Sequence, residues 1–431
     1  MLRLGRQFIF DRLLNSAALL LGFFLWSSTA LAEQGTWDPR FGSVSDSGTA
    51  MIVHQGKAYC GNGRFWDGTI LGTWQTNGVG AGDFATDGTN LYAVGSIRVG
   101  DQNLTVGVWD GVAWKSVGMG TTHGIFGLNL SLAAEWYRGQ FFAAGNFSSM
   151  GWKPIEHVAR YVGSDWLAVG DGVSHRISDE SYIFALLVMG DKLYAGGIID
   201  GLEANPGVAQ WDGTNWTYLG NSPVYSGTTR VLSTDGTNLY SGGRFNSMNG
   251  VAATNIARWD GTNWHALGTG LNGDVAAIAC VGNKVYAGGS FTKAGELLAP
   301  GVAVWDGSKW SGLGAGLNGT TNDPVRQPEV KHLLAYGKDL LVSGYFTRAG
   351  DVPSKGFAIW HPDGRPELNV VRAGDRIQLT WSADQTNAVL EVSDSMSATN
   401  WLSLGSTTFG TNRFEATLNG TNRFFRLRQN P

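Results

Sequence analysis

The 431-residue chain has few charged residues and almost no cysteine. Asp, Glu, Lys and Arg make up 15% of it, and the formal net charge is -4. A chain without a basic excess lacks the electrostatic signature of a protein that binds nucleic acid or an anionic membrane. The two cysteines, Cys60 and Cys280, lie in apolar runs typical of strands, which favours two buried thiols over a disulfide.

Only one apolar run approaches the length of a membrane span, and it lies near the N-terminus. It extends from Leu13 to Trp26 after three arginines, and "SSTALA" (27–32) follows with small residues spaced as a signal peptidase requires. We therefore expect residues 1–32 to be a signal peptide, with an uncleaved anchor as the alternative. The rest of the chain is then secreted or at the cell surface, without a further membrane span.

Motifs that would indicate catalysis are missing. The sequence contains no "HExxH", no Cys-x-x-Cys pair and no phosphate-binding loop before a helix, and its seven histidines are scattered. We expect no metal and no cofactor, and we favour a non-catalytic protein while leaving the question of an enzyme open.

Glycine, in contrast, is abundant: 63 residues, about twice its usual share. Many of the glycines belong to an internal repeat that resembles "VYAGGSF" (285–291). The seven copies recur about every 47 residues, between the periods of WD40 and kelch repeats. The other copies are "AYCGNGRF" (58–65), "LYAVGSI" (91–97), "FFAAGNF" (141–147), "LYAGGII" (193–199), "LYSGGRF" (239–245) and "LVSGYF" (341–346).

Each full repeat contains four strand-like runs separated by turn signals, as residues 275–317 show most clearly. The turn between the third and fourth runs lies between two tryptophans in "WDGTNW", at 211–216 and 259–264. Because "DGTN" also forms turns without flanking tryptophans, we interpret its aspartate as a turn residue and the tryptophans as a cross-strand pair. A ligand site repeated in every copy is the weaker interpretation.

Four antiparallel strands in each of seven repeats predict an all-β, seven-bladed β-propeller, with six blades possible because the first copy is weak. The seventh copy lacks a fourth strand after Trp360. The segment "GTWDPRFGS" (35–43) is a strand without a repeat of its own, so we predict that it completes the last blade.

The pattern "YAGGxFTxAG...VAxWDGxxWxxLGxG" resembles the kelch-like, galactose-oxidase-like propeller repeats of secreted bacterial proteins and of fungal cortical-marker surface proteins. The resemblance implies a propeller over residues 33–365 and implies little about chemistry, because propellers have many functions. Residues 366–431 alternate as short strands and resemble the small immunoglobulin-like or fibronectin type III-like modules found at the C-termini of exported bacterial repeat proteins.

In such a propeller the loops from second to third strands and from each sheet to the next share one face. These loops are long here and carry many of the few charges, so we expect the ligand to bind on this long-loop face. The candidate residues are His175, Arg176, Asp179, Glu180, Arg230, Asp323, Arg326 and Glu329, with Trp152 and Tyr225 as aromatic side chains that could stack on sugar rings.

The sequence thus predicts an exported, monomeric, non-catalytic propeller that binds an extracellular polysaccharide or a surface protein. The alternative is a polysaccharide-active enzyme, a glycoside hydrolase or lyase, in which a carboxylate pair such as Asp179 and Glu329 would act.

Overall fold

The structure is a computed structural model in which strands, and no helices, form the described part of the chain. The residues that it describes are 33, 35–38, 50–68, 71–74, 80–99, 102–118, 133–173, 182–199, 207–220, 227–319, 327–362, 369–373, 376–380, 388–393, 401–406, 413–417 and 424–429. The predicted signal peptide lies outside them.

Most strands belong to four-stranded antiparallel sheets in which successive strands pair with each other. The first strands are β2 (Met51–His54), β6 (Ala81–Thr86), β10 (Ala133–Tyr137), β16 (Tyr182–Met189), β20 (Gly227–Thr234), β26 (Val275–Val281) and β33 (Glu329–Tyr336). The second strands are β3 (Lys57–Cys60), β7 (Leu91–Val99), β11 (Gln140–Ala144), β17 (Lys192–Ile198), β21 (Leu239–Phe245), β27 (Lys284–Gly289) and β34 (Asp339–Tyr345).

The outer half of each sheet repeats in the same way. The third strands are β4 (Arg64–Trp66), β8 (Gln102–Trp109), β14 (Val158–Val162), β18 (Val208–Trp211), β24 (Ile256–Trp259), β30 (Val302–Trp305) and β37 (Phe357–His361). The fourth strands are β5 (Leu71–Thr73), β9 (Trp114–Ser116), β15 (Asp165–Ala168), β19 (Trp216–Tyr218), β25 (Trp264–Ala266), β31 (Trp310–Gly312) and, beside β37, β1 (Thr36–Trp37).

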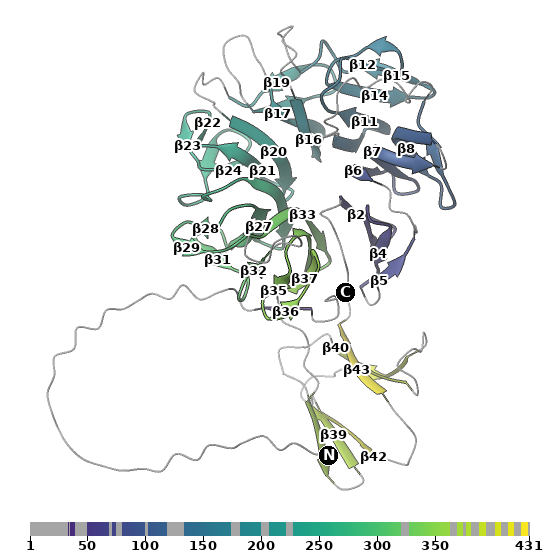
Figure 1. Ribbon diagram of the computed structural model, residues 1–431, viewed down its shortest axis with the longest axis vertical. Coiled ribbons are helices and arrows are strands. Elements are labelled where there is room, and N and C mark those ends of the chain that lie inside the picture. Colours follow the sequence, from purple (N-terminus) through teal and green to yellow (C-terminus); the bar gives the residue numbers. More distant parts are fainter. Residues whose placement is uncertain are drawn as a thin grey trace, which may run out of the picture. The chain divides into compact units, whose positions relative to one another are not determined.

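The first strands follow one another in space as they do in the chain (Figure 1). Each contacts the first strand of the sheet before it and of the sheet after it, and β33 also contacts β2. Sheets arranged in this order are consistent with a β-propeller.

Short hairpins lie between the second and third strands of several sheets. They are β12 (Ser149–Met150) with β13 (Lys153–Pro154), β22 (Ser247–Met248) with β23 (Val251–Ala252), β28 (Lys293–Ala294) with β29 (Leu297–Leu298), and β35 (Arg348–Ala349) with β36 (Val352–Pro353). Strand β32 (Leu317–Asn318), which precedes β33, also pairs with β35.

Small residues of the repeat let neighbouring sheets pack closely. Ala195 and Ala287 are fully buried. A Cβ atom added to Gly242 of β21 would lie 2.6 Å from Val275 Cγ1 and 2.9 Å from Ile278 Cδ1 of the next first strand. Because real Cβ atoms do not come so close, only glycine fits there, and the neighbouring sheets can stack closely.

The aspartates of the "WDG" turns are structural. Asp212 Oδ1 accepts hydrogen bonds from the N–H groups of Thr214 and Asn215 at 2.7 and 2.8 Å. Trp211 and Trp216 pair across the strands, with ring centroids 5.4 Å apart. The turn interpretation is confirmed, and the equivalent aspartates at 110, 260 and 306 accept the same pair of backbone bonds.

In three of the four tryptophan pairs the second tryptophan, which is Trp216, Trp264 or Trp310, has a further role that we did not predict. Its indole N–H crosses to the preceding sheet: Trp216 donates to the Val169 carbonyl oxygen at 2.9 Å and Trp310 to that of Leu267 at 2.8 Å. The residue therefore links adjacent sheets as well as the two strands of its hairpin. The exception is Trp114, whose indole N–H has no hydrogen-bond partner within the described residues.

The N-terminal strand β1 completes the sheet of β33, β34 and β37, as predicted. Residues 39–43 of the predicted segment lie outside the described part of the chain. Trp37 pairs with Trp360, and their ring centroids lie 5.0 Å apart. The indole N–H of Trp37 donates to the Leu313 carbonyl oxygen at 3.3 Å, so it makes the same kind of link to the preceding sheet as Trp216, Trp264 and Trp310. Glu33, just upstream, bonds through its side chain to Lys284 and Tyr286 of that sheet.

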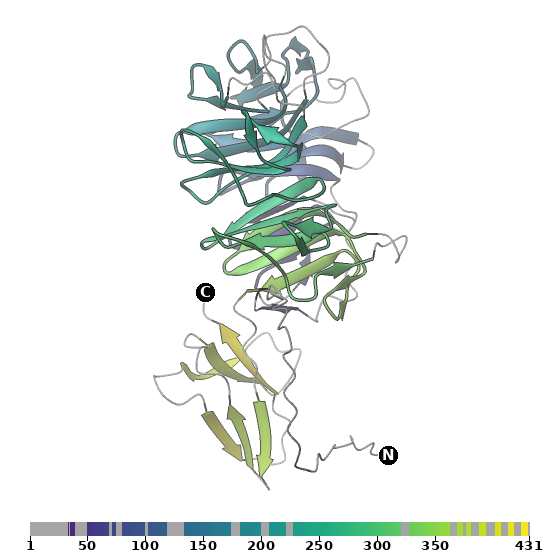
Figure 2. The same ribbon diagram turned by 90° about the vertical axis from the view of Figure 1, so that its left-hand side faces the viewer.

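The C-terminal part of the chain contains two three-stranded antiparallel sheets, drawn in yellow-green (Figure 2). One pairs β38 (Asn369–Ala373), β39 (Arg376–Thr380) and β42 (Arg413–Thr417), and the other pairs β41 (Leu402–Ser406), β40 (Ala388–Ser393) and β43 (Phe424–Gln429). The immunoglobulin-like or fibronectin-like assignment remains a prediction.

Both cysteines are free thiols, and Cys60 is buried. No helix of the described chain is long and apolar enough to cross a membrane.

Candidate ligand-binding site

Three of the predicted site residues lie in the described part of the chain: Arg230, Glu329 and Trp152. The remaining candidates lie outside it, namely His175, Arg176, Asp179, Glu180, Tyr225, Asp323 and Arg326. Arg230 and Glu329 are on first strands β20 and β33, which both contact β26, whereas Trp152 is on a separate hairpin.

A β-bulge positions Arg230, and the second glycine of the repeat makes room for the bulge. A Cβ atom on Gly243 of β21 would overlap the carbonyl oxygen of Thr228 on the paired strand β20, and one on Gly289 would overlap that of Asp274. The pairing register shifts at these places, between Thr229 and Val231 and between Val275 and Ala277. The double glycine therefore lets the first strand bulge toward its partner.

The bulge recurs on five first strands, β6 and the four consecutive strands β16, β20, β26 and β33, each time near the strand's beginning. In the four consecutive strands the extra residue at the register shift is Phe184 in β16, Arg230 in β20, Ala276 in β26 and Lys331 in β33. The residue two positions earlier is Tyr182, Thr228, Asp274 and Glu329, respectively. The fold thus presents different side chains at equivalent positions around one end of the first strands.

On β16 these positions hold an aromatic pair. The rings of Tyr182 and Phe184 are stacked, with centroids 6.0 Å apart and planes 7° from parallel. Both residues are half-buried, so part of each remains accessible to solvent.

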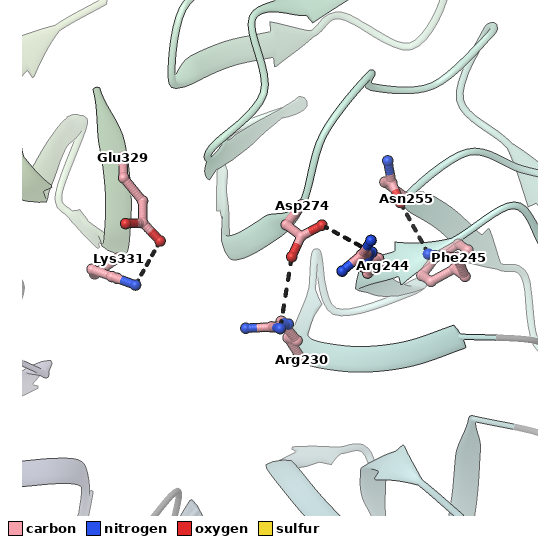
Figure 3. A network of polar contacts seen from close by, with 7 residues as sticks. All are labelled: Arg230, Arg244, Phe245, Asn255, Asp274, Glu329 and Lys331. Atoms are coloured by element: carbon pink, nitrogen blue, oxygen red, sulfur yellow. Dashed lines mark hydrogen bonds and ion pairs between the residues drawn. The ribbon is translucent and has the colours of Figure 1, made fainter. Parts of the chain in front are cut away.

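On β20 and β21 two arginines face one aspartate (Figure 3). Arg230 Nη2 lies 3.6 Å from Asp274 Oδ2, and Arg244 Nε lies 3.8 Å from Asp274 Oδ1. The Arg244 side chain is 78% exposed and that of Asp274 is 32% exposed. These distances exceed those of charge-assisted hydrogen bonds, and such exposed pairs contribute little to stability.

On β33, in contrast, the charges are paired at hydrogen-bond distance. Lys331 Nζ donates to Glu329 Oε1 at 2.6 Å and lies 5.7 Å from the centre of the Tyr345 ring. Figure 3 shows this pair and the Arg230–Asp274–Arg244 group side by side along neighbouring strands.

We call these side chains the bulge cluster: Tyr182, Phe184, Arg230, Arg244, Asp274, Glu329 and Lys331. The loops that contain most of the other predicted site residues run directly into it in the chain, since residues 174–181, 221–226 and 320–326 precede β16, β20 and β33. Sequence analysis identified Arg230 and Glu329 but missed the rest, for which the double glycine on the paired strand was the available signal.

Trp152 occupies a strained backbone position. It lies in the turn of the β12–β13 hairpin with φ of 66°, and its side chain is 70% exposed. The corresponding turn of β22–β23 has Gly250 at this place, with φ of 79°. A tryptophan in the left-handed region is unusual, and such strain is concentrated at functional positions.

Two half-buried carboxyl groups on the first strands β6 and β10 escaped the sequence analysis. Asp83 Oδ2 accepts the Ala134 N–H of the neighbouring first strand at 2.9 Å, and Glu135 Oε1 accepts the Trp136 N–H at 2.9 Å. Desolvation raises the pKa of Asp83 to about 6. Desolvation also raises the pKa of Glu135, to about 7, and the negative charge of Asp83 nearby contributes to this shift. Because these carboxyl groups satisfy backbone donors, we assign them a structural role.

In the described ranges, no three His, Cys, Asp or Glu side chains lie close enough together to hold a metal ion.

No protein-family model and no curated protein matches the chain. Similar solved structures include the computationally designed Ika8 protein (12% identity, 82% of this chain and 96% of that one, TM-score 0.41). Another is PorZ, a surface component of the type IX secretion system of Porphyromonas gingivalis (11% identity, 87% of this chain and 64% of that one, TM-score 0.41). A third is the extracellular domain of a putative hybrid two-component system from B. thetaiotaomicron (11% identity, 90% of this chain and 55% of that one, TM-score 0.47).

The chain spans less than two-thirds of the length of the last two proteins. Both of these are surface or extracellular proteins, but similarity at TM-scores below 0.5 does not bear on what this chain binds. The resemblance to kelch-like repeats likewise remains a prediction.

Proposed function

We propose that the protein is an exported, non-catalytic β-propeller that binds an extracellular polysaccharide through the bulge cluster and the long loops leading into it. The observation that carries this proposal is the presence of a stacked aromatic pair and two arginines around the bulges of the neighbouring strands β16 and β20, with Phe184 and Arg230 as the bulged residues and Arg244 on the paired strand β21. Sugars are bound by aromatic faces together with a few well-placed polar groups, and both are offered here.

The architecture that we propose has seven blades closed into a ring over residues 33–365. The order of contacts among the first strands, returning from β33 to β2, supports it, as does the completion of the last sheet by β1. Residues 1–32 would be removed as a signal peptide, and residues 366–431 would form a separate small β module. We also propose that the protein is a monomer.

The experiment is retention of the mature protein on immobilised polysaccharides, compared with retention on surface proteins. Phe184→Leu should weaken polysaccharide binding, whereas Thr262→Ala, in an exposed turn on the opposite face, should leave it unchanged. Equal losses in both variants, or binding to a surface protein alone, would contradict the polysaccharide proposal.

The same samples distinguish a binder from a polysaccharide-active enzyme. A binder leaves the chain length of the polysaccharide unchanged after long incubation. New reducing ends or unsaturated sugar ends that disappear when Glu329 is replaced by Gln would favour the enzyme instead.

A further inference from the structure

We infer that the bulge cluster selects polysaccharides that carry carboxylate groups, with the uronic acid carboxylate bound by Arg230 and Arg244. This inference rests on the proposed function and names its ligand class.

The first observation is that the hydrogen-bond donors of both guanidinium groups are unused. Over the described residues, neither group makes a hydrogen bond, and their only charged partner is Asp274, at 3.6 and 3.8 Å. A guanidinium group has five N–H donors in a fixed planar fork. Because the two guanidinium groups share one carboxylate, which lies beyond hydrogen-bond distance, most of their N–H donors are available to a ligand.

The second observation is the local charge balance. The Lys331 charge is matched by Glu329 within the same strand, at 2.6 Å. Asp274 alone faces two arginines, so the uncompensated positive charge of the cluster lies at Arg230 and Arg244. An added carboxylate would neutralise it and would accept two parallel N–H bonds from one guanidinium fork.

The third observation is the neighbouring aromatic pair. Strands β16 and β20 are in contact, and Phe184 and Arg230 are the bulged residues of these adjacent strands. A uronic acid unit carries an apolar C–H face and a carboxylate on the same ring. The cluster offers a partner for each: Tyr182 and Phe184 for the face, and the arginines for the carboxylate.

The test measures binding of the mature protein to polygalacturonate, alginate and hyaluronate, each compared with its carboxyl-esterified form, which keeps the sugar backbone and removes the charge. We expect binding of at least one acidic polymer, with about tenfold or greater loss on esterification and on combining Arg230→Gln with Arg244→Gln. Added salt should weaken the binding. Lys309→Gln, which removes one positive charge from an exposed turn, is the control and should change binding less than about twofold.

The outcomes separate the inference from the proposed function. Equal binding of acidic and esterified polymers, unaffected by the arginine double variant but weakened by Phe184→Leu, would overturn the inference and leave the proposed function standing. Preference for a sulfated over every carboxylated polymer would overturn the carboxylate assignment. No binding to any polysaccharide, with thermal unfolding unchanged, would overturn both.

Discussion

At the scale of single residues, several polar side chains accept hydrogen bonds from backbone N–H groups. Asp83 on β6 accepts an N–H of the neighbouring first strand, and the turn aspartates accept two N–H groups each. Such side chains complete hydrogen bonds that the sheets leave open, because buried backbone donors must find partners. We therefore expect these carboxyl groups to affect how the stability of the protein depends on pH, and not to take part in ligand binding.

The raised pKa values of Asp83 and Glu135 give a prediction for stability. Both carboxyl groups bind protons more tightly in the folded protein than in the unfolded chain. The free energy of unfolding therefore falls as the pH rises from about 4 through the pKa values of the folded state, about 6 and about 7. Combining Asp83→Asn with Glu135→Gln should flatten this part of the curve of unfolding free energy against pH, measured by urea denaturation, and make the variant relatively more stable at pH 8.

The matched control for this pair is Asp212→Asn. Hydrogen bonds from the Asn215 and Thr214 N–H groups lower the pKa of Asp212, so the substitution should leave the slope between pH 5 and 8 unchanged. An unaltered slope in the double variant would show that the two carboxyl groups are ionised as in water.

Trp152 gives a second prediction at this scale. Replacing it with Asn, which tolerates the left-handed conformation, should relieve strain and raise the free energy of unfolding by about 1 kcal/mol in denaturant titrations. The same change should weaken polysaccharide binding if the exposed ring contacts sugar, which isothermal calorimetry measures. A less stable variant with full binding would argue that Trp152 only packs against the protein.

At the scale of elements, the double glycine couples the sheet to the candidate site. Gly242 lets the next sheet approach, and Gly243 lets its own first strand bulge and display Arg230. One short motif thus fixes both the spacing of the sheets and the direction of a site residue.

We predict that Gly243→Ala disturbs the bulge. The added methyl group would overlap the Thr228 carbonyl oxygen, so we expect a loss of about 1–3 kcal/mol in thermal or chemical unfolding and weaker ligand binding. Gly312→Ala is the control, because the nearest atom to its added Cβ is the Leu298 oxygen at 3.9 Å. Equal stability of the two variants would mean that the bulge does not depend on glycine.

Much of the structure at the scale of elements was predictable from the sequence, because the sequence repeats. The "DG" turns, the tryptophan pairs and the pairing of the strand at Trp37 with the last sheet were all found by comparing copies, and the structure has them. The bulge cluster was not found as a unit, because its residues differ from copy to copy and lie where loop meets strand. The indole bonds between sheets were missed because each partner carbonyl belongs to the preceding repeat.

At the scale of the whole molecule, the segment around β1 ties the beginning of the described chain to its last four-stranded sheet. Trp37 packs on Trp360 and bonds to Leu313, and His361 lies between two carboxylates, with Nδ1 2.6 Å from Asp339 Oδ1 and Nε2 3.4 Å from Asp38 Oδ2. The contacts that hold β1 on this sheet therefore involve both apolar packing and polar bonds.

We predict that Trp37→Ala lowers the free energy of unfolding by about 3–5 kcal/mol, because it removes a buried ring and an indole hydrogen bond at the closure. Trp152→Ala, at an exposed position, should change stability by less than about 1 kcal/mol in the same urea titrations. Similar small effects of both would show that β1 adds little to the stability of the sheets.

The pairing of β1 with β37 also determines when folding can finish. Its partners are separated by nearly the whole run of repeats, and contacts of such long sequence separation form slowly. During synthesis Trp37 emerges early and stays unpaired until Trp360 has followed. Until β1 has paired with β37, the outer edge of the last sheet is open and another copy could add a strand to it, so the chain is most vulnerable to aggregation just before this pairing forms.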